Sequence, residues 1–114
     1  MNNNKGTGTK IKVKCYYTDY VNHMIRFYLS TPEGLNLQER QYSNASINNW
    51  SAVQLVFHRL DPVDTELVRA VFGMDHYLPR AVEGYCKKNN ADPDEVWKVI
   101  TRVNAKIARV RGLM

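Results

Sequence analysis

The stretch Asp92-Pro93-Asp94-Glu95 constrains the fold more than any other, because it marks the beginning of a helix at a defined residue. Asp92 can accept a hydrogen bond from the first turn, Pro93 suits the first helical position, and Glu95 completes a capping-box pattern. Apolar residues then recur every three or four positions, which is the spacing of a helix that buries one face. The pattern predicts a long amphipathic helix over residues 92–111.

At 100° per residue, this predicted helix divides into three faces. Apolar residues fill one arc and cations fill a neighbouring arc, so the helix should bury one side and present a row of positive charges to solvent. The apolar face contains Val96, Val99, Ile100, Val103, Ile107 and Val110, the cationic flank contains Lys98, Arg102, Lys106 and Arg109, and the remaining face, expected to be exposed, contains Trp97, Thr101, Asn104 and Ala108.

The same periodicity predicts four further helices upstream, separated by polar or proline-containing turns. They span residues 18–30, 46–60, 62–73 and 79–90. We therefore predict an all-α protein of about five helices, with a flexible basic arm at 1–17 and a single helical domain at 18–114. The last two helices are joined by only a few residues, which is typical of a helix-turn-helix, here expected at about 79–111.

Capping and glycine signals set the boundaries of these upstream helices. Thr18 and Ser46 are the expected caps of the first two, and Asp61 caps the third, which begins at Pro62. Gly73 is expected to end that third helix. Gly84 lies in the middle of the fourth helix, where glycine is unfavourable, and is expected to permit close helix packing.

The charge of the chain is positive and unevenly distributed. The 114 residues carry a formal net charge of +5. From Val96 to the end there are only basic ionised residues, and Lys5, Lys10, Lys12 and Lys14 precede the first acidic residue. Two basic segments favour a polyanionic partner, although solubility alone could explain a charge of this size.

Composition also bears on location and chemistry. No apolar run is long enough for a membrane span, the first ten residues contain no apolar stretch typical of a secretory signal, and two isolated cysteines favour free thiols. We therefore expect a cytoplasmic protein with no membrane partner. The three histidines have no metal-ligand spacing around them, and no phosphate loop or paired nucleophile is present. We expect no catalytic residue, no metal and no cofactor.

Residues 57–113 resemble the helix-turn-helix of sigma-factor region four, and more closely the small phage and mobile-element transcriptional regulators of the ArpU type. The resemblance rests on Leu60-Asp61-Pro62 with Glu66-Leu67-Val68, on Tyr85-Cys86 and on Val96-Trp97-Lys98. It implies a non-enzymatic regulator of transcription in which the helix at 92–111 reads double-stranded DNA.

A DNA-binding function predicts contacts from several elements. Lys and Arg side chains neutralise phosphates, and polar side chains beside them can reach base edges. RNA polymerase or another protein is a candidate further partner, and a homodimer would match two half-sites. The predicted contacts are Lys98, Thr101, Arg102, Lys106, Arg109 and Trp97 on the last helix, Arg80, Lys87 and Lys88 on the preceding helix, and Lys10, Lys12 and Lys14 on the arm.

The alternative is a helical protein–protein interaction module that keeps the shape of a degenerate helix-turn-helix. The acidic first turn of the last helix favours this alternative, since carboxylates repel phosphates. Trp97, expected to be exposed, would be its anchor. The two hypotheses differ in the side chains they need, because DNA binding depends on Lys98 and Arg102 whereas the alternative depends on Trp97.

Overall fold

The computed structural model describes residues 15–31 and 42–114, and every regular element in these ranges is a helix. This confirms the all-helical class and the expected number of helices. The predicted arm lysines Lys10, Lys12 and Lys14 lie outside the described residues. The helices are α1 (Thr18–Ser30), α2 (Asn44–Arg59), α3 (Pro62–Met74), α4 (Leu78–Asn89) and α5 (Pro93–Arg111).

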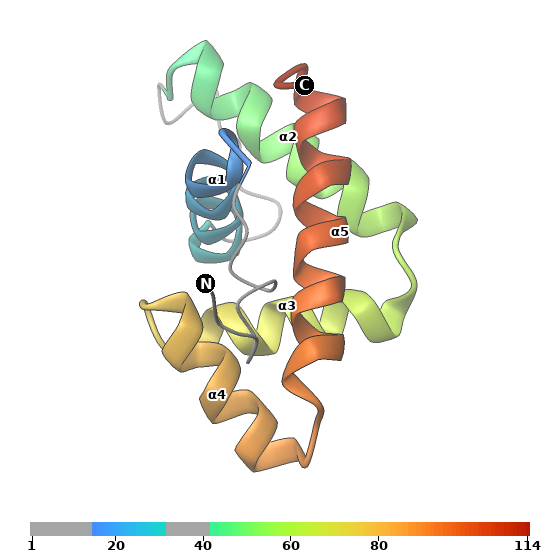
Figure 1. Cartoon of the computed structure of the whole chain (residues 1–114). Coiled ribbons are helices and arrows are strands. Elements are labelled where there is room, and N and C mark those ends of the chain that lie inside the picture. The colour runs from blue at the N-terminus through green and yellow to red at the C-terminus, as the bar shows by residue number, and fades with distance from the viewer. Residues whose placement is uncertain (1–14, 32–41) are drawn as a thin grey trace.

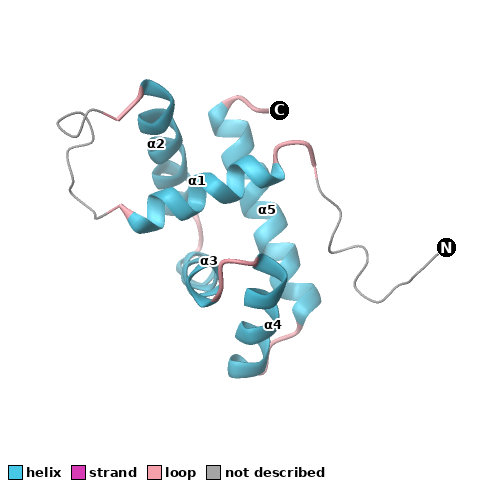
Figure 2. Ribbon diagram, turned by 90° about the vertical axis from the view of Figure 1, so that its left-hand side faces the viewer, coloured by secondary structure: helices cyan, strands magenta, loops and turns pink. Residues whose placement is uncertain are grey.

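Helix α5 is the central element of the fold, because it packs against each of the other four helices. Figure 1 shows α5 running the height of the molecule, with α1 and α2 beside its C-terminal part and α3 and α4 beside its N-terminal part. The view turned by 90° keeps the same order along α5 (Figure 2). The last helix of the chain is therefore the one around which the others assemble.

The core fills the space between these helices. Its largest fully buried side chains include Met24 and Ile25 of α1 and Ile107 of α5. The Tyr28 ring lies 5.1 Å from the Trp50 ring and 5.3 Å from the Phe57 ring, which joins α1 to α2. Burial of such apolar surface is the main favourable term in folding.

The capping signals of α3 and α5 are confirmed. Asp61 precedes Pro62 and its carboxylate accepts a hydrogen bond from the Val63 N–H at 3.1 Å. The Asp92 carboxylate likewise accepts a hydrogen bond from the Asp94 N–H, at 3.0 Å. Each carboxylate satisfies a backbone donor that the helix leaves unpaired, and each lies near the positive end of the helix dipole.

The expected caps of α1 and α2 are wrong by one to three residues. Helix α2 begins at Asn44, and Ser43 caps it by accepting from the Ser46 N–H at 3.1 Å. Ser46 is itself helical, so its backbone cannot take the extended conformation of a cap. Thr18 lies inside α1, and its hydroxyl accepts from the Cys15 N–H at 3.0 Å, upstream of the helix.

The ends of α3 and α4 differ in how well the sequence predicts them. Helix α4 ends at Asn89, and Asn90 takes the left-handed conformation with φ of 54°, as its side chain type favours. Gly73, in contrast, does not end α3, because the helix continues to Met74 and Asp75 follows in an extended conformation. A single glycine does not by itself end a helix when the residues that follow it can still form their helical backbone hydrogen bonds.

Gly84 is not needed for close packing, contrary to expectation. A Cβ added there would meet only the Cε of Met74, at 4.0 Å.

We expect Gly84→Ala to raise the free energy of unfolding by about 0.5 to 1 kcal/mol, because alanine loses less backbone entropy in a helix. Urea denaturation followed by circular dichroism measures this. Gly112→Ala is the matched control and should destabilise, since Gly112 has φ of 81°. A loss of stability in Gly84→Ala would contradict the open space seen beside this residue.

Candidate nucleic-acid interface

The buried face of α5 is wider than its apolar periodicity predicts. Asn104 and Ala108, both expected to be exposed, are 4% and 0% exposed. For Asn104 the cause is α1, because the Asn104 Nδ2 donates to the Asn22 Oδ1 of that helix at 3.2 Å. Trp97 was also expected to be exposed, but it is half-buried against the core. Val110, expected in the buried face, is 43% exposed.

The cationic flank of α5 is exposed along its length, as expected, but its first half is paired with acids. The Lys98 Nζ lies 3.4 Å from the Glu95 Oε2 in the preceding turn. The Arg102 Nη2 lies 2.7 Å from the Asp64 Oδ2, which belongs to the first turn of α3. Surface pairs of this kind contribute little stability, but they compensate the positive charge locally.

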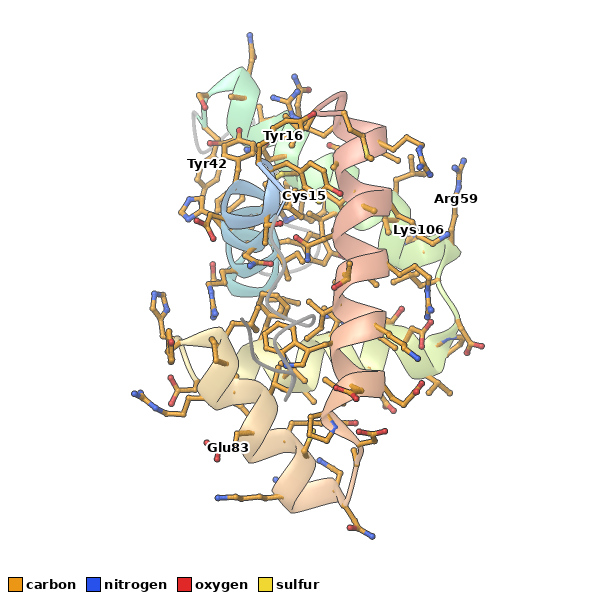
Figure 3. All side chains as sticks on the ribbon, in the orientation of Figure 1. Cys15, Tyr16, Tyr42, Arg59, Glu83 and Lys106 are labelled. Atoms are coloured by element: carbon orange, nitrogen blue, oxygen red, sulfur yellow. The ribbon has the colours of Figure 1, made fainter. Side chains whose placement is uncertain are left out.

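The second half of the flank carries uncompensated charge. Lys106 and Arg109 are exposed and form no ion pair with any residue of the two described ranges. Arg59, at the end of α2, is also exposed and unpaired in this sense, and Figure 3 shows it projecting from the same side as Lys106. We call Arg59, Lys106 and Arg109, together with the paired Lys98 and Arg102, the basic surface.

The cations predicted on α4 are largely compensated. Arg80 lies 3.6 Å from the Asp75 carboxylate and over the Tyr77 ring at 5.4 Å. The Lys87 Nζ lies 3.8 Å from the Glu83 Oε2 one turn earlier. Lys88 is exposed and has no ion pair among residues that the structure describes. Helix α4 therefore adds one uncompensated cation, away from the C-terminal half of α5.

The acidic first turn of α5 has a structural explanation. Asp92 caps the helix and Glu95 pairs with Lys98. Both carboxylates also lie at the positive end of the helix dipole, where negative charge is favourable. The tip of α5 therefore offers no positive charge of its own to a phosphate.

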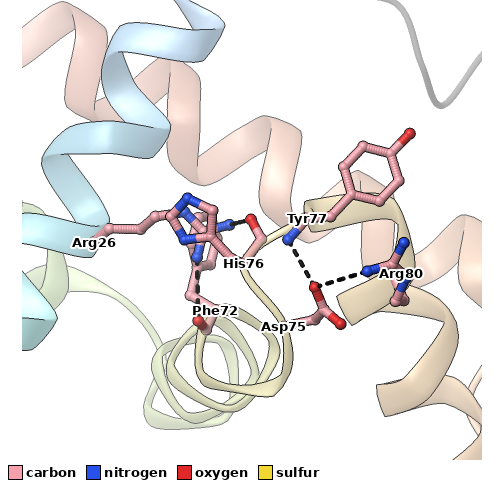
Figure 4. A network of polar contacts seen from close by, with 6 residues as sticks. All are labelled: Arg26, Phe72, Asp75, His76, Tyr77 and Arg80. Atoms are coloured by element: carbon pink, nitrogen blue, oxygen red, sulfur yellow. Dashed lines mark hydrogen bonds and ion pairs between the residues drawn. The ribbon is translucent and has the colours of Figure 1, made fainter.

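A polar network that the sequence did not reveal fixes the turn between α3 and α4 (Figure 4). The Arg26 guanidinium of α1 donates to the Phe72 carbonyl at 3.4 Å and to the His76 carbonyl at 2.6 Å. Burial lowers the pKa of Arg26, and the Asp75 carboxylate opposes this shift. No motif signals such a contact, because Arg26 and His76 are 50 residues apart in the chain.

The two cysteines are free thiols in different environments. Cys15 is exposed, whereas Cys86 is buried. Burial raises the pKa of the Cys86 thiol, and the Asp92 carboxylate raises it further.

We expect Ellman's reagent at about pH 8 to modify one thiol quickly in the folded protein and the second only after unfolding, because the thiolate is the reactive form. Cys15→Ser should abolish the fast phase, and a fast phase that survives this change would contradict the assignment.

Across 15–31 and 42–114, no group of three or more His, Cys, Asp or Glu residues is arranged to hold a metal ion. Within the same ranges, none of the helices has the length and apolar character that crossing a membrane requires. The described helices thus assemble around α5, and Lys106 and Arg109 on that helix are exposed without an ion pair among the described residues. Comparison of the chain with family models, curated proteins and solved structures finds no match.

Proposed function

We propose that this protein is a non-enzymatic DNA-binding regulator of transcription that contacts double-stranded DNA through the basic surface. The observation that carries the proposal is the exposure of Arg59, Lys106 and Arg109 without acidic partners among the described residues, with Arg59 and Lys106 projecting from the same side of the molecule (Figure 3). Phosphate contacts release counterions and supply most of the sequence-independent affinity for DNA.

The packing of α5 favours a surface that is held in place before DNA binds. Lys106 and Arg109 lie on α5, which packs against four other helices. Arg111 of the same helix donates to the Asn49 Oδ1 of α2 at 2.7 Å. A positive surface on a well-packed element does not need to be ordered on binding, which lowers the cost of association.

The arrangement of α4 and α5 supports a helix-turn-helix as the framework for this function. Only residues 90–92 separate the end of α4 from the start of α5, and α3 packs against both helices. The resemblance of residues 57–113 to sigma-factor region four also supports a helix-turn-helix. In that framework the first turn of the second helix usually meets the bases. Here that turn is acidic, so we propose that backbone contacts from the C-terminal half of α5 dominate the affinity.

The alternative, a protein-interaction module anchored by Trp97, has less support. Trp97 is half-buried and packs against the core, so it does not project as a binding anchor does. A partner that bound this surface would have to reach a tryptophan that the fold already covers in part.

Fluorescence anisotropy with a labelled mixed-sequence duplex tests the proposed function. We expect binding in the micromolar range that weakens as salt increases, with a log–log slope of about −0.9 for each phosphate contacted. A supercoiled plasmid and a single strand of the same sequence serve as competitors that distinguish duplex preference from general polyanion binding. Absence of binding at about 0.05 M salt, where phosphate contacts are strong, would overturn the proposal.

A further inference from the structure

Arg102 lies in the middle of the cationic flank of α5, where a carboxylate from another helix already pairs with it. Lys98 and Lys106 lie four residues before and after Arg102, so the three side chains follow one another along the same side of α5. The Arg102 side chain is 50% exposed. Arg102 therefore has the position and the exposure needed to extend the phosphate-contacting surface that we propose for Lys106 and Arg109.

The acid that engages Arg102 comes from α3 and is held in place by the fold. The Arg102 Nη2 lies 2.7 Å from the Asp64 Oδ2, a distance typical of a charge-assisted hydrogen bond. The Asp64 side chain is only 22% exposed and belongs to the first turn of α3, which packs against α5. Because this carboxylate is already positioned, the pair costs less side-chain entropy than a pair of two mobile surface side chains.

The other ion pair of the cationic flank is more exposed and longer. The Lys98 Nζ lies 3.4 Å from the Glu95 Oε2, and the two side chains are 67% and 68% exposed. Two long side chains on one exposed helix face hold each other weakly, so a phosphate can readily replace the carboxylate. The contact that can withhold a cation from DNA is therefore the one made by Asp64.

Asp64 is also suited to its own helix, which has to be separated from its effect on Arg102. A negative charge in the first turn of a helix is favourable whether or not an arginine is near. The N-terminus of α3 has a second acid, since Asp61 caps it by accepting from the Val63 N–H at 3.1 Å. A test of the pair must therefore show that the effect of Asp64 on DNA binding depends on Arg102.

We propose that Asp64 competes with DNA phosphates for Arg102 and so keeps the duplex affinity of the basic surface below the value that its cations allow. A carboxylate and a phosphate offer the guanidinium the same kind of acceptor oxygens, so Arg102 engages one or the other. The contact is autoinhibitory, and loss of the Asp64 charge adds a cation to the DNA surface. This inference rests on the proposed function.

Fluorescence anisotropy of Asp64→Asn in the full chain, with the labelled duplex at several salt concentrations, tests the competition. We expect the variant to bind about tenfold more tightly at about 0.05 M salt, with a log–log slope steeper by about 0.9, because Arg102 then contacts one more phosphate. Circular dichroism verifies that the variant is folded. An affinity and a slope equal to those of the unaltered chain would overturn the proposal.

Glu66→Gln is the matched control, because it removes the same charge from the same helix. Glu66 is exposed and lies two residues after Asp64, which places it roughly 200° around the axis of α3. We expect its affinity for the duplex to change by less than about twofold, since exposed charges away from the interface are screened. A gain as large as that of Asp64→Asn would show that net charge alone is responsible, and the inference would be wrong.

A double-mutant cycle with Arg102→Gln assigns the effect to the pair. In the Arg102→Gln background, Asp64→Asn should strengthen binding by less than about threefold, because no arginine is left to release and only screened repulsion is removed. The same tenfold gain in both backgrounds would show that Asp64 acts without Arg102, which contradicts the proposal.

The same titrations separate this inference from the function on which it rests. Absence of duplex binding by both the unaltered chain and Asp64→Asn at about 0.05 M salt would overturn both proposals. Duplex binding by the unaltered chain that Asp64→Asn leaves unchanged would overturn only the competition between Asp64 and phosphate.

Discussion

Replacing Ile107 with alanine should lower the free energy of unfolding by about 4 kcal/mol, which is close to the upper end for removing a buried isoleucine side chain. Ile107 is 0% exposed and lies on α5, which every other helix contacts. Because α5 packs against the four other described helices, the surroundings of a fully buried side chain on it have little freedom to move inward and fill the space. Urea denaturation with the linear extrapolation method measures the change.

Val110→Ala is the matched control for this experiment. Val110 lies one turn further along α5 and is 43% exposed, so its truncation should cost less than about 1 kcal/mol. Similar losses for the two variants would contradict the buried face that we assign to α5. A small loss in Ile107→Ala would contradict the central position of the helix in the fold.

Reversing two charges of the basic surface, Lys106→Glu with Arg109→Glu, should weaken duplex binding by at least about 100-fold. Each phosphate contact contributes roughly tenfold to affinity at about 0.05 M salt, and two contacts are lost. Repulsion between the new carboxylates and the phosphates adds to this loss. Anisotropy at constant salt measures the effect, and circular dichroism verifies that the double variant stays folded, since both side chains are exposed.

Lys88→Glu is the control for charge reversal away from α5, and it changes the net charge by half as much as the double variant does. Lys88 is exposed on α4 and, like Lys106, has no ion pair within the described ranges. We expect less than about a tenfold loss in this variant, because long-range attraction between exposed charges is screened beyond about 10 Å at 0.1 M salt. If Lys88→Glu weakens binding as much as the double variant does, the DNA surface is not the one on α5.

The positions of the helices could be predicted from the sequence because their signals are local. Asp61 with Pro62, and Asp92 with Pro93, each combine a side-chain acceptor with a residue suited to the first turn. Asn90 likewise marks the end of α4 through its own backbone preference. The error at Ser46 arises because Ser43 offers the same cap three residues earlier. The error at Thr18 has another cause, since Tyr17 is the N-cap of α1 and makes no side-chain capping bond.

The faces of α5 could be predicted only in part. Periodicity identifies a buried stripe, but it does not show how many neighbours cover the helix or from which sides. Asn104 is buried where α1 packs beside the stripe, and its contact with Asn22 joins residues 82 positions apart in the chain. A polar residue such as Asn104 gives no sign in the sequence that it will be enclosed.

The charge of the candidate interface could likewise be predicted only as a row of cations. The pair between Lys98 and Glu95 is local and follows from helical spacing. The pair between Arg102 and Asp64 joins residues 38 positions apart, so only the fold reveals that this arginine is compensated. The addition of Arg59 from α2 was missed for the same reason.

Titration of the ¹⁵N-labelled protein with a short mixed-sequence duplex, followed by amide chemical shifts, locates the DNA interface residue by residue. If DNA binds the basic surface, we expect the chemical-shift changes to be concentrated at Arg59 and along α5 around Lys106 and Arg109, and to disappear when salt is raised. Shifts confined to the surroundings of Trp97, or no shifts at low salt, would contradict a DNA interface on the basic surface.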